Sequence, residues 1–157
     1  MSKITKEKTC AFYASDYHFE MISLPFIEKK LQEDKKVIVL TENNLEDTMK
    51  FLMSKINLKQ EKKEEISKIN WKNNDLEKFK EIKENVDRNK DLIIFIKGKE
   101  NYIKNVNKNI EKWTENKANV KIIDCYDLEE LGSSISIVKN EYQNVLNTTG
   151  ETKIENL

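Results

Sequence analysis

Arginine, histidine, proline and glycine are scarce in this 157-residue sequence, and the scarcity of arginine, histidine and glycine argues against several classes of function. Arg88 is the only arginine, and the 28 basic residues are balanced by 28 aspartates and glutamates. Arginine is the usual donor for bidentate contacts with phosphates and base edges, and nucleic-acid binding usually needs an excess of positive charge. The composition therefore argues against nucleic acid and against an acidic membrane surface as partners.

Three glycines are too few for the common phosphate-binding loops. A P-loop wraps phosphate with the backbone of Gly-x-x-x-x-Gly-Lys-Ser/Thr, and the dinucleotide fingerprint needs Gly-x-Gly-x-x-Gly. Gly98 and Lys99 are followed by Glu100, and Ile93 stands where the first glycine of a P-loop belongs. The sequence therefore has no nucleotide-hydrolysis motif, and we expect no cofactor.

His18 is the only histidine, and no Cys-x-x-Cys or His-x-x-x-His spacing accompanies it, so we expect no metal site. Cys10 and Cys125 lie in apolar segments and are expected to be buried, free thiols. Residues 1–8 are charged and no signal-peptide segment follows them, while the apolar run at 92–96 is far too short to span a membrane. These features favour a cytoplasmic protein with no membrane contact.

Short apolar segments alternate with segments of helical periodicity along the chain. The first two strands are joined by about twenty residues of helical pattern, which forms a βαβ unit and makes the strands parallel. Strands are expected at residues 9–14, 37–40, 66–71, 91–97 and 120–126. The pattern predicts one α/β domain over residues 1–157, a three-layer sandwich with a mainly parallel five-stranded sheet.

Helices are expected between these strands, at 17–32, after Asn44, after Asn74 and after the strand at 91–97, with a final helix at 133–146. Pro25, the only proline, lies inside the first helix, so a kink or break near Met21 is expected. Charges of alternating sign at 58–68 indicate a solvated helical turn or loop. Residues 1–8 and 148–157 are expected to be mobile, and the end of the chain is either a tail or one extra edge segment.

Functional groups in parallel sheets gather beyond the carboxyl ends of the strands. The candidate binding residues at that edge are Tyr13, Asp16, His18, Glu42, Trp71, Lys97, Lys99, Tyr126 and Asp127. Aromatic walls with a few polar anchors suit a small-molecule pocket, although polar strand ends are ordinary in any α/β protein. No set of residues is recognisable as catalytic. The alternative function is a small enzyme with Asp16 or Asp127 as general base.

Two segments resemble MEDS domains, the methanogen and methylotroph sensory domains. The first is FYASDYHFEMISLPFIEKKLQEDKKVIVLTE at 12–42, and the second is DCYDLEELGSSISIVKNEYQNVLNTTG at 124–150. The residues that carry the resemblance are Phe12, Tyr13, Pro25, Phe26, Tyr126 and Asp127. None of these six is an established catalytic residue of the family, and the segment KGKENY departs from the family pattern.

The resemblance implies a RecA- or KaiC-like core without the nucleotide-binding loop. It also implies the strand order 5-1-4-3-2, which places the strand at 91–97 between the strands at 9–14 and 66–71. The expected function is non-enzymatic sensing or regulation in bacterial signalling. The partner would be a small molecule or a protein, such as a signalling kinase or a transcription regulator, and oligomerisation is possible.

In this strand order, Cys10 and Cys125 lie on neighbouring parallel strands about 4.8 Å apart. If the two strands align at their starts, the cysteines are offset by about four positions, or roughly 13 Å along the sheet. A disulfide needs Cα atoms within about 7 Å, so no bridge between them is expected.

Overall fold

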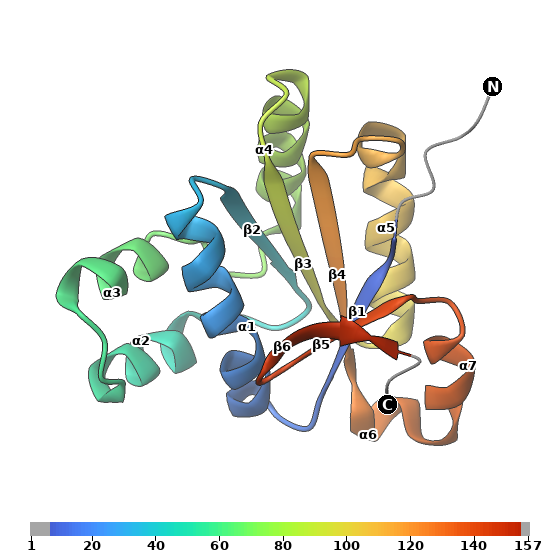
Figure 1. Ribbon diagram of the computed structural model, residues 1–157, viewed down its shortest axis with the longest axis horizontal. Helices are drawn as coiled ribbons and strands as arrows, with labels where there is room; N and C mark the ends of the chain where they lie inside the picture. The colour runs from blue at the N-terminus through green and yellow to red at the C-terminus, as the bar shows by residue number, and fades with distance from the viewer. Residues whose placement is uncertain (1–6, 155–157) are drawn as a thin grey trace.

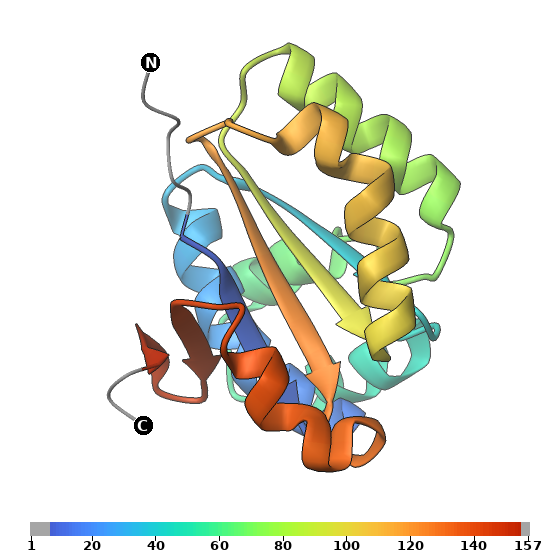
Figure 2. The same ribbon diagram turned by 90° about the vertical axis from the view of Figure 1, so that its right-hand side faces the viewer.

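The computed structural model describes residues 7–154, which form a six-stranded, mostly parallel sheet with helices on both faces (Figures 1 and 2). Its elements are β1 (Thr9–Tyr13), α1 (Asp16–Gln32), β2 (Lys36–Thr41), α2 (Glu46–Lys55), α3 (Gln60–Ser67), α4 (Asp75–Asp87), β3 (Leu92–Gly98), α5 (Glu100–Thr114), β4 (Val120–Asp127), α6 (Leu128–Leu131), a 3-10 turn (Gly132–Ser134), α7 (Ile135–Lys139), β5 (Asn144–Asn147) and β6 (Gly150–Lys153). The strand order is β2-β3-β4-β1-β5-β6. The predicted α/β class is therefore confirmed.

The sheet separates two apolar cores. Helices α1, α2 and α3 cover one face, where Phe19 and Phe95 pack edge to face at a centroid distance of 6.3 Å. Helices α4, α5 and α7 cover the other face (Figure 2). Ile103 and Ile110 of α5 belong to the apolar core on this face. Every residue of β3 is buried, as a central strand covered on both sides requires.

The predicted strand order is wrong in detail. The strands at 9–14 and 120–126 are neighbours, as expected, because β1 pairs with β4 in parallel. The strand at 91–97, however, lies between β2 and β4 and does not touch β1. The predicted strand at 66–71 does not exist: Ile66 lies in α3 and Trp71 in the following loop. Both side chains are buried in the core on the face covered by α1, α2 and α3, and this burial, not strand pairing, explains why they are apolar.

The predicted final helix at 133–146 is also wrong. Helix α7 ends at Lys139, and β5 then pairs in parallel with the start of β1. The chain turns at Thr148 and Thr149, and β6 pairs antiparallel with β5. Of the two alternatives for the chain end, residues 150–153 form the extra edge segment. The expectation of mobile ends falls partly on residues 1–6 and 155–157, which lie outside the described residues.

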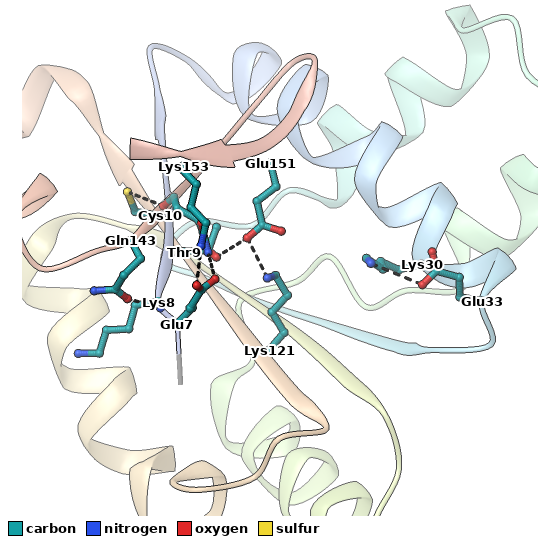
Figure 3. A network of polar contacts seen from close by, with 11 residues as sticks. Glu7, Lys8, Thr9, Cys10, Lys30, Glu33, Lys121, Gln143, Glu151 and Lys153 are labelled. Atoms are coloured by element: carbon teal, nitrogen blue, oxygen red, sulfur yellow. Dashed lines mark hydrogen bonds and ion pairs between the residues drawn. The ribbon is translucent and has the colours of Figure 1, made fainter. Parts of the chain in front are cut away.

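Polar contacts fasten the β5–β6 hairpin to the sheet (Figure 3). The Glu151 carboxylate on β6 accepts hydrogen bonds from the hydroxyl of Thr9 on β1 and from the ammonium of Lys121 on β4. Because of these bonds and the Lys121 ion pair, the pKa of Glu151 lies below its usual value, although burial acts in the opposite direction. Lys153 pairs with Glu7 beside them. The hairpin is therefore held at the amino-terminal half of β1, away from the carboxyl edge of the sheet.

Helix α1 runs without interruption from Asp16 to Gln32, although Pro25 lies inside it. The expected break near Met21 does not occur. Ile22 and Ile27, on either side of the proline, are both buried in the same core. Packing of this apolar face compensates for the backbone hydrogen bond that proline cannot donate.

Cys10 and Cys125 are free and buried, as predicted, but the expected offset is wrong. Cys10 pairs with Asp124 and Ala11 pairs with Cys125, so the cysteines are one position apart along the sheet. The difference arises because β4 begins three residues before the point where it meets Thr9. Neighbouring positions point to opposite faces of a sheet, and the two thiols accordingly lie in different cores. Opposite orientation, and not distance along the strands, prevents a disulfide.

Both thiols are expected to resist modification in the native protein. Burial raises the pKa of Cys10 to about 12 and raises the pKa of Cys125 well above its usual value, so reactive thiolate is scarce at neutral pH. Labelling with Ellman's reagent at pH 7.5 should be roughly a hundredfold slower in buffer than in denaturant, where two thiols should react. Rapid labelling of one thiol in buffer would show that its strand opens readily.

Candidate functional site

The carboxyl ends of β1, β2, β3 and β4 lie at one edge of the sheet, next to the start of α1. The register places Thr41 beside Lys97, and Tyr13 beside Asp127. This edge holds most of the residues predicted from the sequence, but their side chains divide into separate groups with different roles.

Lys97 is the centre of the first group. Its side chain is only 2% exposed, and its ammonium nitrogen lies 2.8 Å from Oδ1 of Asp16 at the start of α1. The same nitrogen donates a hydrogen bond of 2.9 Å to Oδ1 of Asn43, and Asn43 Nδ2 donates one of 3.0 Å to Oδ2 of Asp16. The rings of Tyr13 and Phe19 also face the ammonium, with centroids at 4.6 and 5.5 Å. These five residues, Lys97, Asp16, Asn43, Tyr13 and Phe19, form the Lys97 cluster. Within it the positive charge of Lys97 and the negative charge of Asp16 balance each other.

Glu42 forms a second group with the start of α5. Its Oε1 accepts a hydrogen bond of 2.9 Å from the backbone N–H of Lys99, the residue that precedes the helix. A carboxylate suits the positive end of a helix. Gly98 makes this approach possible, because a Cβ at this position would lie 2.8 Å from Glu42 Oε1 and 2.7 Å from Cδ2 of Tyr102. The glycine that superficially suggested a P-loop thus serves close packing.

The other candidates have local structural roles. Nδ1 of His18 accepts a hydrogen bond of 2.8 Å from the backbone N–H of Ala14, which closes the turn before α1. Trp71 is buried and its indole N–H donates to the carbonyl of Ile66. Asp127 accepts hydrogen bonds from the first backbone N–H groups of α6, and so caps that helix.

Tyr126 belongs to a polar network inside the core on the other face of the sheet, which α4, α5 and α7 cover. Its hydroxyl lies 2.5 Å from the hydroxyl of Tyr142, which donates a hydrogen bond of 2.6 Å to Oδ2 of Asp124. Oδ1 of Asp124 accepts a hydrogen bond from Asn107 of α5. Burial raises the pKa values of Asp124, Tyr126 and Tyr142. Tyr126 and Tyr142 lie in a different core from Tyr13 and Phe19, the rings that face Lys97.

A pocket of about 750 Å³ lies between α1 and α2, directly beside the Lys97 cluster, and this α1–α2 pocket is the candidate site. Its lining residues are Asp16, Tyr17, Glu20, Met21, Asp47, Thr48, Phe51, Leu52, Lys55 and Ile56. Tyr17 is 63% exposed and Phe51 66% exposed, and Met21 is also exposed. Large apolar side chains gathered around a hollow are typical of a binding site.

Glu20 is the unusual residue of this pocket. Its side chain is 98% buried, since only 2% of the residue is exposed, and its Oε1 has no hydrogen-bond partner. The side chain of Thr48 on α2, whose hydroxyl donates to the carbonyl of Leu45, acts to lower the pKa of Glu20 and partly offsets the effect of burial. Burial is nevertheless the largest influence and raises the pKa of Glu20. Nothing in the sequence pattern distinguishes this residue from a solvated glutamate, so it is not among the residues predicted from the sequence.

A second cavity, of about 620 Å³, runs along the outer edge of β2. Lys78 of α4 is buried there, and its ammonium donates hydrogen bonds to the backbone carbonyls of Val39 and Lys72. Burial lowers the pKa of Lys78 to about 8. Lys78 thereby covers a carbonyl that a partner strand could otherwise use, which is a common protection of an edge strand. We assign this cavity a structural role.

Within residues 7–154, no group of three or more His, Cys, Asp or Glu side chains is arranged to hold a metal ion. The same residues contain no helix of the length and apolarity needed to cross a membrane. Comparison of the chain with protein-family models, curated proteins and solved structures gave no match. The site must therefore be interpreted from its own geometry.

Proposed function

We propose that this chain is a non-enzymatic sensory or regulatory domain that binds a small ligand in the α1–α2 pocket. The observation that carries the proposal is an open, mainly apolar pocket of about 750 Å³ next to a carboxyl edge whose charged groups already bind one another. Small-molecule sites typically enclose about 300–1,000 Å³ and combine apolar walls with few polar groups. The resemblance to MEDS domains, with their RecA- or KaiC-like core, agrees with this proposal.

The occupied carboxylates favour binding over catalysis. A general base must be able to reach a substrate proton. Asp16, one of the two candidate bases, is paired with Lys97 and Asn43. Asp127, the other one, caps α6. Both carboxylates thus have structural roles that a substrate would have to displace.

Asp16 also connects the α1–α2 pocket to the carboxyl edge of the sheet, so ligand binding would change the structure at that edge. It lines the α1–α2 pocket and at the same time holds Lys97 on β3. A ligand that moves the first turn of α1 would therefore alter the Lys97 cluster at the end of the central strand. A protein partner, such as a signalling kinase or a transcription regulator, would bind at the carboxyl edge and distinguish the two arrangements of the Lys97 cluster.

The experiment is a binding measurement with Nile red, a neutral dye that fluoresces in apolar sites. We expect saturable binding to the native protein and a loss of affinity of at least about tenfold in Phe51→Ser, which removes an exposed wall of the pocket. Leu76→Ser is the matched control, because Leu76 is 79% exposed on α4 and does not line the pocket. Equal dye binding in both variants would contradict the proposed site. ATP hydrolysis by the pure protein at about 1 s⁻¹ or faster would contradict the non-enzymatic function.

A further inference from the structure

Glu20 gives the α1–α2 pocket a chemical preference. A carboxyl group that is 98% buried normally has a partner for each oxygen, because burying an unpaired polar atom is costly. Oε1 of Glu20 has none, and Glu20 lies in the lining of the pocket. A ligand that donates a hydrogen bond or brings a positive charge to this oxygen would remove that cost.

The charges around the pocket favour a cation. Three carboxylates line it, from Asp16, Glu20 and Asp47, against the single ammonium of Lys55. The charge of Asp16 is matched by Lys97, which leaves two carboxylates opposite one ammonium. The nitrogen of Lys55 lies 5.7 Å from the ring centroid of Phe51, at the far turn of α2 from Asp47. An anionic ligand would meet repulsion here, and an ammonium group would find opposite charge.

The walls define the rest of the ligand. Tyr17 and Met21 of α1 and Phe51 of α2 present exposed apolar surface around the buried carboxyl group. An alkyl chain or an aromatic ring fits such surface, and the rings can also face an ammonium group favourably. The volume of about 750 Å³ limits the ligand to a small molecule.

From these observations, and resting on the proposed ligand-binding function, we propose that the α1–α2 pocket binds a small primary amine. Its ammonium group donates a hydrogen bond to Oε1 of Glu20, and its apolar part packs against Tyr17, Met21 and Phe51. No bond is made or broken in this binding. The ligand carries its positive charge into a site that otherwise holds an unpaired carboxyl oxygen.

The amine should bind more tightly as the pH rises. Burial raises the pKa of Glu20, so the free protein holds a proton there to a higher pH than an exposed glutamate does. An ammonium ligand needs the carboxylate form, so binding releases this proton and weakens at acid pH. The groups that act on Glu20 are Asp16 on its own helix, Thr48 on α2 and Lys97 on β3. Asp47 and Lys55 of α2 are the other charged residues that line the pocket.

The test compares n-hexylamine with n-hexanol and hexanoate, which share one chain length, by isothermal titration calorimetry at pH 7.5. We expect the native protein to bind hexylamine at least tenfold more tightly than hexanol, and hexanoate more weakly than either. Glu20→Gln should remove the preference for the amine and keep the affinity for hexanol. Glu28→Gln, the same change on the same helix outside the pocket, should behave like the native protein.

The outcomes separate this inference from the proposed function. If hexanol binds as tightly as hexylamine, or if the amine preference persists in Glu20→Gln, the amine assignment is wrong while the pocket still binds apolar ligands. If neither probe nor Nile red binds, both proposals fail. Should Glu20→Gln not fold, the native protein still decides: hexylamine affinity must rise between pH 4.5 and 7.5 while hexanol affinity stays constant, and a flat profile for the amine overturns the assignment.

Discussion

Asp16→Ala is expected to lower the free energy of unfolding by about 3 kcal/mol, because it leaves the buried ammonium of Lys97 without its carboxylate. Lys97 is only 2% exposed, so its ammonium group depends on the side chains packed around it and not on water. The oxygen of Asn43 and the ring of Tyr13 remain as partners and keep the loss near the lower end of the range for a broken buried pair. Urea denaturation followed by circular dichroism at pH 7 measures this value.

Removing the lysine of this ion pair should lower the free energy of unfolding much less than removing the aspartate. Lys97→Met removes the buried charge and fills the space with an apolar chain, while Asp16 remains 37% exposed and can be hydrated. We expect a loss of about 1 kcal/mol or less. Asp47→Ala, which removes an acidic residue from the first turn of α2 without exposing a buried partner, should cost about 0.5 kcal/mol. Equal losses for Asp16→Ala and Lys97→Met would show that the ion pair, and not the buried lysine, determines the effect.

The part of the fold that follows from local pattern was predictable. The apolar run of β2 ends at polar residues, and the apolar residues of α4 and α5 recur with helical spacing. Their predicted positions therefore agree with the structure to within a few residues. Strand order is different in kind, because it depends on which strands pair and not on any single segment. The order transferred from the family placed β3 beside β1, whereas β4 lies between them.

Two segments were mispredicted because burial and secondary structure are separate properties. Ile66 and Trp71 are apolar since they pack under α1, and they need no strand to be buried there. The segment from Ser133 to Leu146 has an apolar stripe that fits a helix, yet Ile137 is exposed and Val145 lies in β5. The turn that follows, Asn147 to Gly150, is the local signal for a hairpin and was available in the sequence.

Of the nine candidate binding residues named from the sequence, only Asp16 lines the α1–α2 pocket. Asp16 and Lys97 meet because the parallel strands β1 and β3, although β4 lies between them, end at the same edge of the sheet. Successive side chains of a strand point to opposite faces of the sheet, and the position of Tyr126 in β4 directs its side chain into the core covered by α4, α5 and α7. Glu20 and Phe51 come together only through the packing of α1 against α2, so no single-segment pattern could have joined them.

Tyr142→Phe is expected to have the second large effect, a loss of about 2–3 kcal/mol at pH 7.5. The missing hydroxyl leaves Asp124 with Asn107 as its remaining side-chain donor, and it leaves the hydroxyl of Tyr126 without its partner. The rings of Tyr126 and Tyr142 still pack edge to face at 6.0 Å, so little apolar contact is lost. The control is Tyr17→Phe, which removes an exposed hydroxyl and should change stability by less than about 0.5 kcal/mol.

The pH dependence of the Tyr142→Phe effect gives its sharpest test. Burial raises the pKa of Asp124 above its unfolded value, so the folded state binds a proton more readily, and stability falls as the pH rises from about 4 through the folded pKa. The hydrogen bond from Tyr142 favours the carboxylate and reduces this loss. Without it the carboxylate is less stable still, so the cost of Tyr142→Phe should be larger at pH 7.5 than at pH 4. Asp124→Asn, which cannot ionise, should make the cost of the same change independent of pH. A cost that stays constant in the native background would mean that Asp124 keeps the same charge in the folded protein at both pH values.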